Sequence, residues 1–163
     1  SSLRIHHVTA EHPRSPANTL FADVLKPLLE QGATFVDPTR FTVDFEMSLA
    51  YPALPFLTLR LAVMATRYFR ATYGLHCVRP EHGAFYKRVL SSSLMCEARE
   101  YPGVGFPMEL WGTRAQEVYE KTLRRYPFFD STDEERRQIF APPYEMPIWV
   151  HPSVRAAMDE VDY

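Results

Sequence analysis

The segment of residues 35–44 places charged side chains inside what is otherwise the pattern of a buried strand. It reads Phe-Val-Asp-Pro-Thr-Arg-Phe-Thr-Val-Asp, and its apolar residues predict a strand in the interior of a sheet. Because burying a charge is costly, Asp37 and Arg40 need either a partner or a polar cleft. Two interpretations stay open: the two side chains form an ion pair on an edge strand, or they face a cleft that uses them.

Length, charge and cysteine usage limit the class of protein. The chain has 163 residues, enough for one domain with its own core, and a formal net charge of −2. This charge excludes the broad basic footprint of a nucleic-acid-binding protein. With no signal-peptide pattern and no transmembrane segment, we expect a cytoplasmic location. Cys77 and Cys96 lie in apolar strand-like runs, which indicates reduced, buried thiols.

Hydrophobic periodicity predicts alternating strands and helices. Strands are predicted over 3–9, 35–44, 75–78, 93–99 and 108–111, and helices over 19–31, 55–73, 80–90, 113–125, 130–140 and 152–161. Asn18 is the expected N-cap of the first helix, Gly74 the expected end of the second, and Thr113 the expected start of a capping box. The order predicts an α/β fold, a mixed central sheet flanked by helices.

Three segments resemble known acyltransferases. Asp-Pro-Thr-Arg-Phe-Thr-Val at 37–43 resembles the Glu-x-Ser-Arg-Phe-x-Val strand of acyl-homoserine-lactone synthases. Pro-Glu-His-Gly-Ala-Phe-Tyr at 80–86 and Tyr-Pro-Gly-Val at 101–104 are similar to segments of long-chain N-acyl amino acid synthases. Both groups belong to the GNAT acyltransferase superfamily. The resemblance implies a GNAT-like fold in which two adjacent parallel strands in the middle of the sheet splay apart to admit the pantetheine arm of an acyl donor.

The resemblance covers residues 3–111, which we take as the GNAT-like core, followed by a C-terminal helical extension over 112–163. The first strand and helices of the family have no counterpart, so we expect an N-terminal part of the fold to be missing from this chain. Many GNAT proteins bind the coenzyme A pyrophosphate on a glycine-rich turn before a helix, but residues 46–56 contain no glycine. We therefore expect no permanently bound cofactor. Acyl-phosphopantetheine on an acyl carrier protein is the expected co-substrate, with acyl-CoA less favoured.

By the resemblance, two side chains take catalytic positions. Asp37 replaces the family glutamate and would orient the amine or receive its proton through water. Tyr86 would protonate the leaving thiolate, unless it is a half-buried packing residue. Arg40 would hold the carboxylate of an amino acid, unless it pairs with Asp37 or Asp44.

The resemblance also implies four further substrate-binding candidates: Arg4, Thr39, Phe41 and His82. A solvated charge is the alternative for Arg4, and a structural role the alternative for His82. His6, His7 and His12 lack the accompanying carboxylates or cysteines of a metal site, so no metal is expected.

The primary hypothesis is an N-acyltransferase that moves a fatty acyl group from acyl carrier protein to the amine of an amino acid or derivative. One alternative is an autoinducer synthase, an acyl-homoserine-lactone synthase that uses S-adenosylmethionine. Another is a catalytically silent GNAT-like module that binds an acyl chain or a protein. The primary hypothesis requires two strands to part, with the carboxylate of Asp37 and the phenol of Tyr86 facing the opening from the same side of the sheet.

Overall fold

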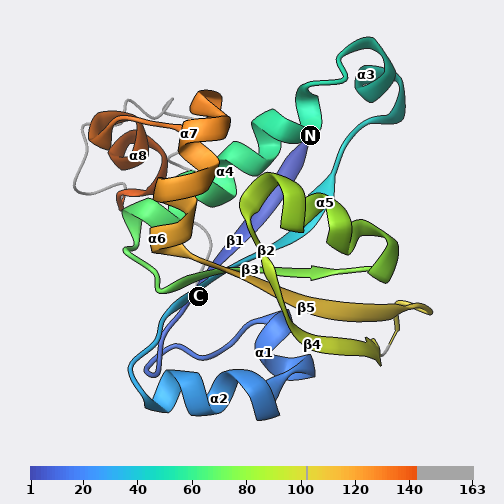
Figure 1. The fold of residues 1–163 in the computed structure, drawn as a ribbon, viewed down its shortest axis with the longest axis vertical. Helices are drawn as coiled ribbons and strands as arrows, with labels where there is room; N and C mark the ends of the chain where they lie inside the picture. Colours follow the sequence, from blue (N-terminus) through green and yellow to red (C-terminus); the bar gives the residue numbers. More distant parts are fainter. Residues whose placement is uncertain (102, 143–163) are drawn as a thin grey trace, which may run out of the picture.

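A five-stranded mixed sheet forms the centre of the molecule. The computed structural model describes residues 1–101 and 103–142. The strands are β1 (Ser2–Val8), β2 (Phe35–Thr42), β3 (Tyr73–Val78), β4 (Ser93–Glu100) and β5 (Pro107–Arg114). They lie in the order β1-β2-β3-β5-β4 (Figure 1). The pair β2–β3 is parallel and the other three described pairs are antiparallel, so the predicted mixed sheet is confirmed.

Helices cover both faces of the sheet. One face is covered by α1 (Pro16–Leu20) and α2 (Ala22–Glu30), whose Phe21, Leu25 and Leu29 form a core with Val8 and Phe35. The other is covered by α4 (Leu54–Tyr68) and α5 (Pro80–Leu90). Figure 1 shows the two layers below and above the sheet. The remaining helical segments are α3 (Phe45–Ala50), α6 (Ala115–Glu117), a π-helix (Val118–Thr122), α7 (Leu123–Arg125), a 3₁₀-helix (Pro127–Phe129) and α8 (Asp133–Phe140).

The parallel strands β2 and β3 part after a short paired stretch. They pair only at Phe35–Tyr73 and Val36–Gly74, although both strands continue beyond these residues. Pro38 has no N–H to donate, and a register shift in the β1–β2 pair leaves Arg40 with a φ of 52°. These features bend β2 away from its neighbour. The predicted splay of two adjacent parallel strands is therefore present.

Three predicted helix boundaries are wrong because tertiary contacts override local signals. Gly74 lies inside β3, where it pairs with Val36, instead of ending a helix. Thr113 lies in β5, and its hydroxyl bonds to buried side chains instead of capping a helix. Ser15 caps α1 by accepting from the Asn18 N–H, so the predicted N-cap Asn18 lies within the helix. The predicted helix over 152–161 lies outside the described residues.

The segment between β2 and α4 contains the helix α3, where no helix was predicted. Asp44 begins it by accepting from the Met47 N–H at 2.9 Å. Phe45, Leu49 and Tyr51 are 74%, 67% and 60% exposed. α3 projects beyond the body of the molecule (Figure 1). It places an apolar surface beside the end of β2.

The helices that follow β5 pack against α4 through arginine contacts. The Arg60 guanidinium donates to the carbonyl oxygens of Phe128 and Asp130 and pairs with Glu135 at 3.1 Å. Arg67 pairs with the Asp130 carboxylate. These contacts join residues 127–135 to the face of the sheet that carries α4.

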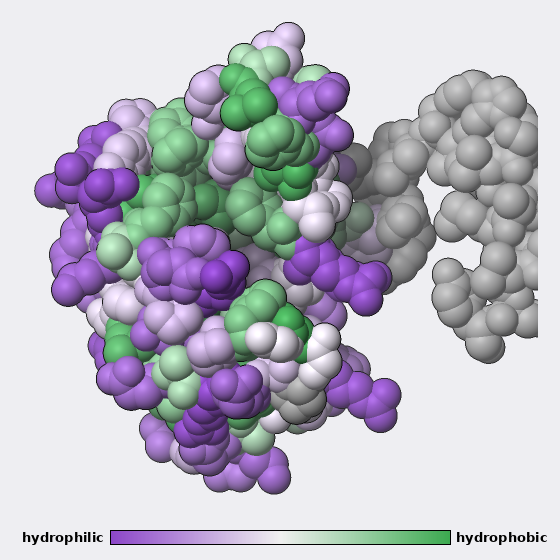
Figure 2. All heavy atoms as spheres, turned by 90° about the vertical axis from the view of Figure 1, so that its right-hand side faces the viewer, coloured by the Kyte–Doolittle hydropathy of each residue, from purple (hydrophilic) through white to green (hydrophobic). Residues whose placement is uncertain are grey.

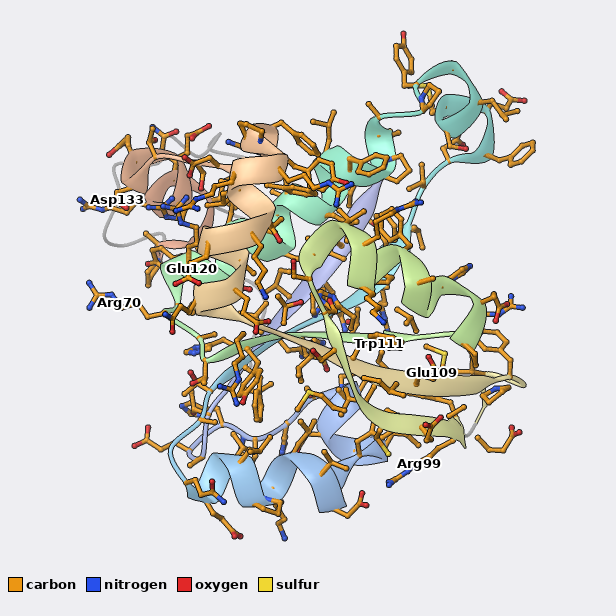
Figure 3. The ribbon with its side chains drawn as sticks, viewed as in Figure 1. Arg70, Arg99, Glu109, Trp111, Glu120 and Asp133 are labelled. Carbon is orange, nitrogen blue, oxygen red and sulfur yellow. The ribbon has the colours of Figure 1, made fainter. Side chains whose placement is uncertain are left out.

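Gly83 allows α5 to lie directly against β5. A Cβ at this position would lie 2.6 Å from Trp111 Cζ2, and the indole is held by its Nε1 donating to Glu109 at 2.7 Å (Figure 3). We expect Gly83→Ala to lower the free energy of unfolding by about 1–3 kcal/mol in urea titrations. The clash outweighs the better helix propensity of alanine. In a Trp111→Leu background the same change should become neutral or stabilising, and a stabilising effect with Trp111 present would contradict this account.

Candidate active site

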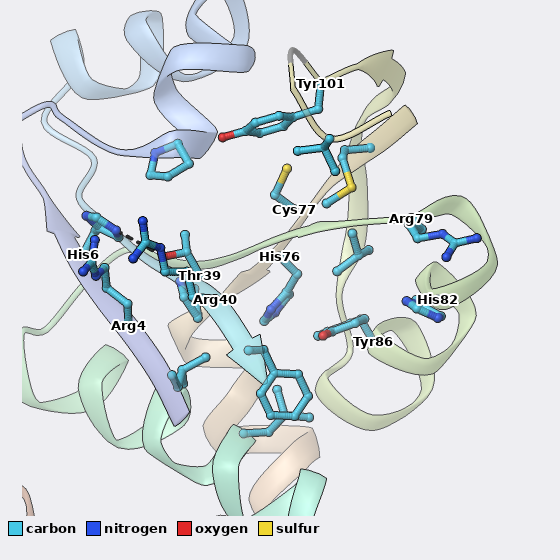
Figure 4. Close-up of a pocket in the computed structure, with 18 of the residues that line it drawn as sticks. Arg4, His6, Thr39, Arg40, His76, Cys77, Arg79, His82, Tyr86 and Tyr101 are labelled. Atoms are coloured by element: carbon cyan, nitrogen blue, oxygen red, sulfur yellow. Dashed lines mark hydrogen bonds between the residues drawn. The ribbon is translucent and has the colours of Figure 1, made fainter. Parts of the chain in front are cut away.

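A cleft occupies the gap between the splayed strands β2 and β3. Its volume is about 660 Å³, and side chains from β1, β2, β3, α5 and the β4–β5 connection line it. Figure 4 shows the opening with one group of labelled side chains on the β1–β2 side and another on the β3–α5 side: Arg4, His6, Thr39 and Arg40, and Arg79, His82 and Tyr86. Six of the seven predicted site residues line this cleft: Arg4, Thr39, Arg40, Phe41, His82 and Tyr86.

Strand alternation gives the cleft two different halves. Val8 packs against α1 and α2. The side chains of His6 and Arg4 lie two and four positions before it on β1, so they point to the same face of the sheet. The ring of His6 is hydrogen bonded to the Thr39 hydroxyl at 3.2 Å. Tyr101 closes this half beside the first helices (Figure 4). This half is therefore polar and carries positive side chains.

The other half of the cleft lies on the face of α4 and α5 and is largely apolar. Leu59 of α4 and Tyr86 of α5 line it, and both belong to the core cluster on that face. His76 of β3 stacks against Tyr86, with ring centroids 4.7 Å apart. Burial raises the pKa of the Tyr86 phenol, so the phenol stays protonated at neutral pH. The prediction of Tyr86 as a general acid remains untested, but the side chain has the required access and protonation state.

Asp37 lies at the base of the polar half and does not line the cleft itself. It is fully buried, and its Oδ2 accepts from the Ala17 N–H at 3.0 Å. Its Oδ1 has no hydrogen-bond partner among the described residues. Burial raises the pKa of this carboxyl, opposed by the Ala17 N–H, the Ser15 side chain and the charge of His6.

The prediction that Asp37 and Tyr86 face the same side of the opening is wrong. Phe35 packs against α1 and α2, and Asp37, two residues further on, points the same way. Tyr86 packs on the opposite face with α4 and α5. The two side chains therefore approach the gap between β2 and β3 from opposite faces of the sheet. The catalytic role of Asp37 remains a prediction.

The charges along the cleft are all of one sign. Arg4, Arg40 and Arg79 line it, and no carboxylate of the described residues does. Within residues 1–101 and 103–142, Arg40 forms no ion pair, so the alternative of a pair with Asp37 or Asp44 is not realised. Arg79 pairs with Glu81 and lies 5.0 Å over the ring of Phe106. The cleft is thus suited to an anionic, partly apolar ligand.

Two residues between the halves, Cys77 and His76, were not predicted as site residues. Cys77 lines the cleft, and burial, reinforced by the Asp37 charge, raises its pKa to about 12, so it is a poor nucleophile at neutral pH. His76 is buried, and burial lowers its pKa to about 3, so its imidazole is neutral. The short apolar pattern of β3 predicts only a buried strand. It does not indicate that His76 and Cys77 border a cleft, because only the splay of β2 and β3 exposes them to one.

Neither a metal cluster nor a spanning helix occurs in the part of the chain that the structure describes. No group of three or more histidine, cysteine, aspartate or glutamate side chains there could hold a metal ion. None of the helices over the same residues is long and apolar enough to cross a bilayer.

A mixed sheet whose two parallel strands splay around a cleft is the arrangement of a GNAT-like fold. The family model of the N-acyl amino acid synthase FeeM matches residues 1–114. The chain therefore belongs to the FeeM N-acyl amino acid synthase family, and it is an enzyme of the acyltransferase class.

Comparison with solved structures agrees on the fold. The structure of FeeM, an N-acyl amino acid synthase from uncultured soil microbes, is similar with a TM-score of 0.63 and 18% sequence identity. The similarity covers 78% of this chain and 67% of that chain. No curated protein matches the sequence.

Proposed function

We propose that this N-acyltransferase moves a fatty acyl group from the phosphopantetheine thioester of an acyl carrier protein to the amino group of an amino acid. The observation that carries the proposal is the two-sided cleft. An apolar half with a protonated phenol opens on one face of the sheet, and a half with Arg4 and Arg40 lies over a buried carboxylate on the other.

The apolar half is the proposed site of the acyl donor. Beyond Val36 and Gly74 the facing edges of β2 and β3 leave backbone groups unpaired, and the amides of a pantetheine arm can pair with them. Apolar surface gathers in the upper part of the molecule, over α3 and the hollow beside it (Figure 2). A fatty acyl chain can follow this surface. The glycine-free segment before α4 favours a carrier protein over coenzyme A as donor.

The cationic half is the proposed site of the amine substrate. The guanidinium groups of Arg4 and Arg40 suit a carboxylate, and the buried, unpartnered Oδ1 of Asp37 would act on the amino group through a water molecule. An α-amino acid carries both groups on one carbon. The arrangement therefore favours an amino acid over a simple amine.

The reaction then proceeds through the gap between the two halves. The neutral amine nitrogen attacks the thioester carbonyl carbon, the C–N bond forms, and the carbonyl oxygen takes the negative charge. The amine loses one proton to Asp37 through water. When the C–S bond breaks, Tyr86 supplies a proton to the leaving thiolate. The products are an acyl amide and a free thiol.

Mass spectrometry of products tests the proposal. The protein would be incubated with acyl carrier protein thioesters of several chain lengths and the standard amino acids, and in parallel with acyl-CoA and with S-adenosylmethionine. We expect N-acyl amino acids from the carrier-protein thioesters. Product formed only from acyl-CoA would overturn the assignment of the donor, and an acyl-homoserine lactone would favour the autoinducer alternative. Bound acyl chain without any amide product would favour the silent module.

Arg40 offers a prediction that separates binding from backbone strain. Its φ of 52° is unfavourable for a residue with a Cβ, and Arg70, outside the cleft, has a φ of 50°. Arg40→Gly should raise the free energy of unfolding by about 1 kcal/mol and raise the KM for the amino acid about 10- to 100-fold, the value of a charge-assisted hydrogen bond. Arg70→Gly should stabilise similarly with no change in KM. Equal KM values for both variants would contradict the role of Arg40.

A further inference from the structure

His76 is held in one orientation by two buried hydroxyl groups. Its Nε2 lies 3.2 Å from the Thr113 hydroxyl, which in turn lies 2.6 Å from the Ser92 hydroxyl. All three side chains are buried, and the imidazole stacks on Tyr86. The imidazole also lines the cleft, beside the Tyr86 phenol (Figure 4). The sequence pattern did not identify this group.

The hydrogen-bond inventory of the group favours one tautomer. Ser92 has one hydroxyl proton, and its only side-chain partner among the described residues is Thr113. If Ser92 donates to Thr113 and Thr113 donates to Nε2, every buried proton has an acceptor. The reverse direction leaves the Ser92 proton buried without an acceptor, which is unfavourable. The Nε2 atom therefore accepts, and the proton of the neutral ring resides on Nδ1.

The Nδ1 edge is the part of the ring left for a ligand. No group in residues 1–101 and 103–142 forms a hydrogen bond with the Nδ1 atom. The atom is also not fully enclosed by protein. It is accordingly a neutral N–H donor at the edge of the cleft. A donor with no protein partner, beside the phenol of Tyr86, suits an oxygen that gains negative charge.

We propose that His76 is a further catalytic residue, whose Nδ1–H donates to the thioester carbonyl oxygen as the amine attacks, with Thr113 and Ser92 as positioning residues. This inference rests on the proposed acyl transfer. The imidazole does not exchange its proton in this role; it stabilises the oxyanion while Tyr86 protonates the thiolate. A neutral ring serves this purpose because its hydrogen bond strengthens as charge develops on the oxygen.

The tautomer can be tested without any substrate. Nitrogen-15 NMR of histidine-labelled protein should show His76 with a protonated Nδ1 and an unprotonated Nε2, identified by its loss in His76→Phe. Thr113→Val removes the partner of Nε2 and should yield a mixture of tautomers. A protonated Nε2 in the wild-type protein would overturn the inference, whatever the activity.

Kinetics test the contact with the thioester. His76→Phe keeps a stacked ring without the donor and should lower kcat about 10²-fold, the effect of losing one oxyanion donor. His76→Asn places an amide N–H near the position of Nδ1 and should recover about tenfold of this loss. His12→Asn, at an exposed site outside the cleft, is the control. Equal activity of the phenylalanine and asparagine variants would overturn the donor role.

The two tests also distinguish this inference from the proposed function. Suppose that the wild-type protein shows no acyl transfer but NMR shows the expected tautomer. The proposed function and the catalytic role of His76 then fail, while the hydrogen-bond direction from Ser92 through Thr113 to His76 stands. With acyl transfer present and no loss in His76→Phe, only the role of His76 fails. Circular dichroism of each variant would confirm that the fold is retained.

Discussion

Tyr86→Phe is expected to lower kcat for acyl transfer by about 10²- to 10³-fold, the usual contribution of a general acid. The change removes only the hydroxyl, so the stacking on His76 and the packing against α4 remain. Because burial raises the pKa of this phenol, the wild-type enzyme keeps its proton at neutral and mildly alkaline pH. Single-turnover assays with an acyl carrier protein thioester would measure the step directly.

The leaving group provides the specific signature of acid catalysis. A thioester of a more acidic thiol needs less protonation, so the defect of Tyr86→Phe should shrink with such a donor. Tyr68→Phe, on the same face of the sheet but outside the cleft, should leave the rate unchanged. An equal defect with both thioesters would contradict the role of Tyr86 as the acid.

Asp37→Asn is expected to lower kcat/KM for the amino acid by about 10²- to 10⁴-fold, because the amide can neither accept a proton nor attract an ammonium group. The amide oxygen still accepts from the Ala17 N–H, so the local structure of α1 should be kept. Steady-state assays with varied amino acid would measure the loss. Asp44→Asn, at the exposed N-cap of α3, serves as the control, since asparagine caps helices as well as aspartate does.

The same substitution should make the protein more stable at neutral pH. Burial raises the folded-state pKa of Asp37 above the ordinary value near 3.8, so the folded protein binds the proton more tightly than the unfolded chain. Wild-type stability therefore falls as pH rises from about 3.8 through the folded-state pKa. The Asp37→Asn variant has no ionisable group at this position, so its stability does not fall for this reason. Urea titrations should show equal stabilities in acid and an advantage of the variant that grows toward pH 8; a less stable variant at pH 8 would contradict the raised pKa.

Local sequence determined the elements and most of the cleft lining. Apolar patterning indicated all five strands, because it depends on neighbours in sequence. The splay of the sheet was implied by the family resemblance of the segments around Arg40 and Tyr86, not by the pattern itself. Arg40 within β2 was a correct sign that this strand borders a cleft, because an interior strand without such an opening would bury the guanidinium unpaired.

The tertiary structure decided which side chains meet. Strand alternation turns Asp37 toward α1 and so separates it from Tyr86, although both flank the same gap. Pairing across β3 and β5 brings Thr113 to His76, and Ser92 reaches the same hydroxyl from the end of α5. These contacts join residues far apart in sequence whose local patterns indicate only strand, turn or cap. Their chemistry depends on burial and on the direction of each side chain, which arise only when the sheet and its two helical layers assemble.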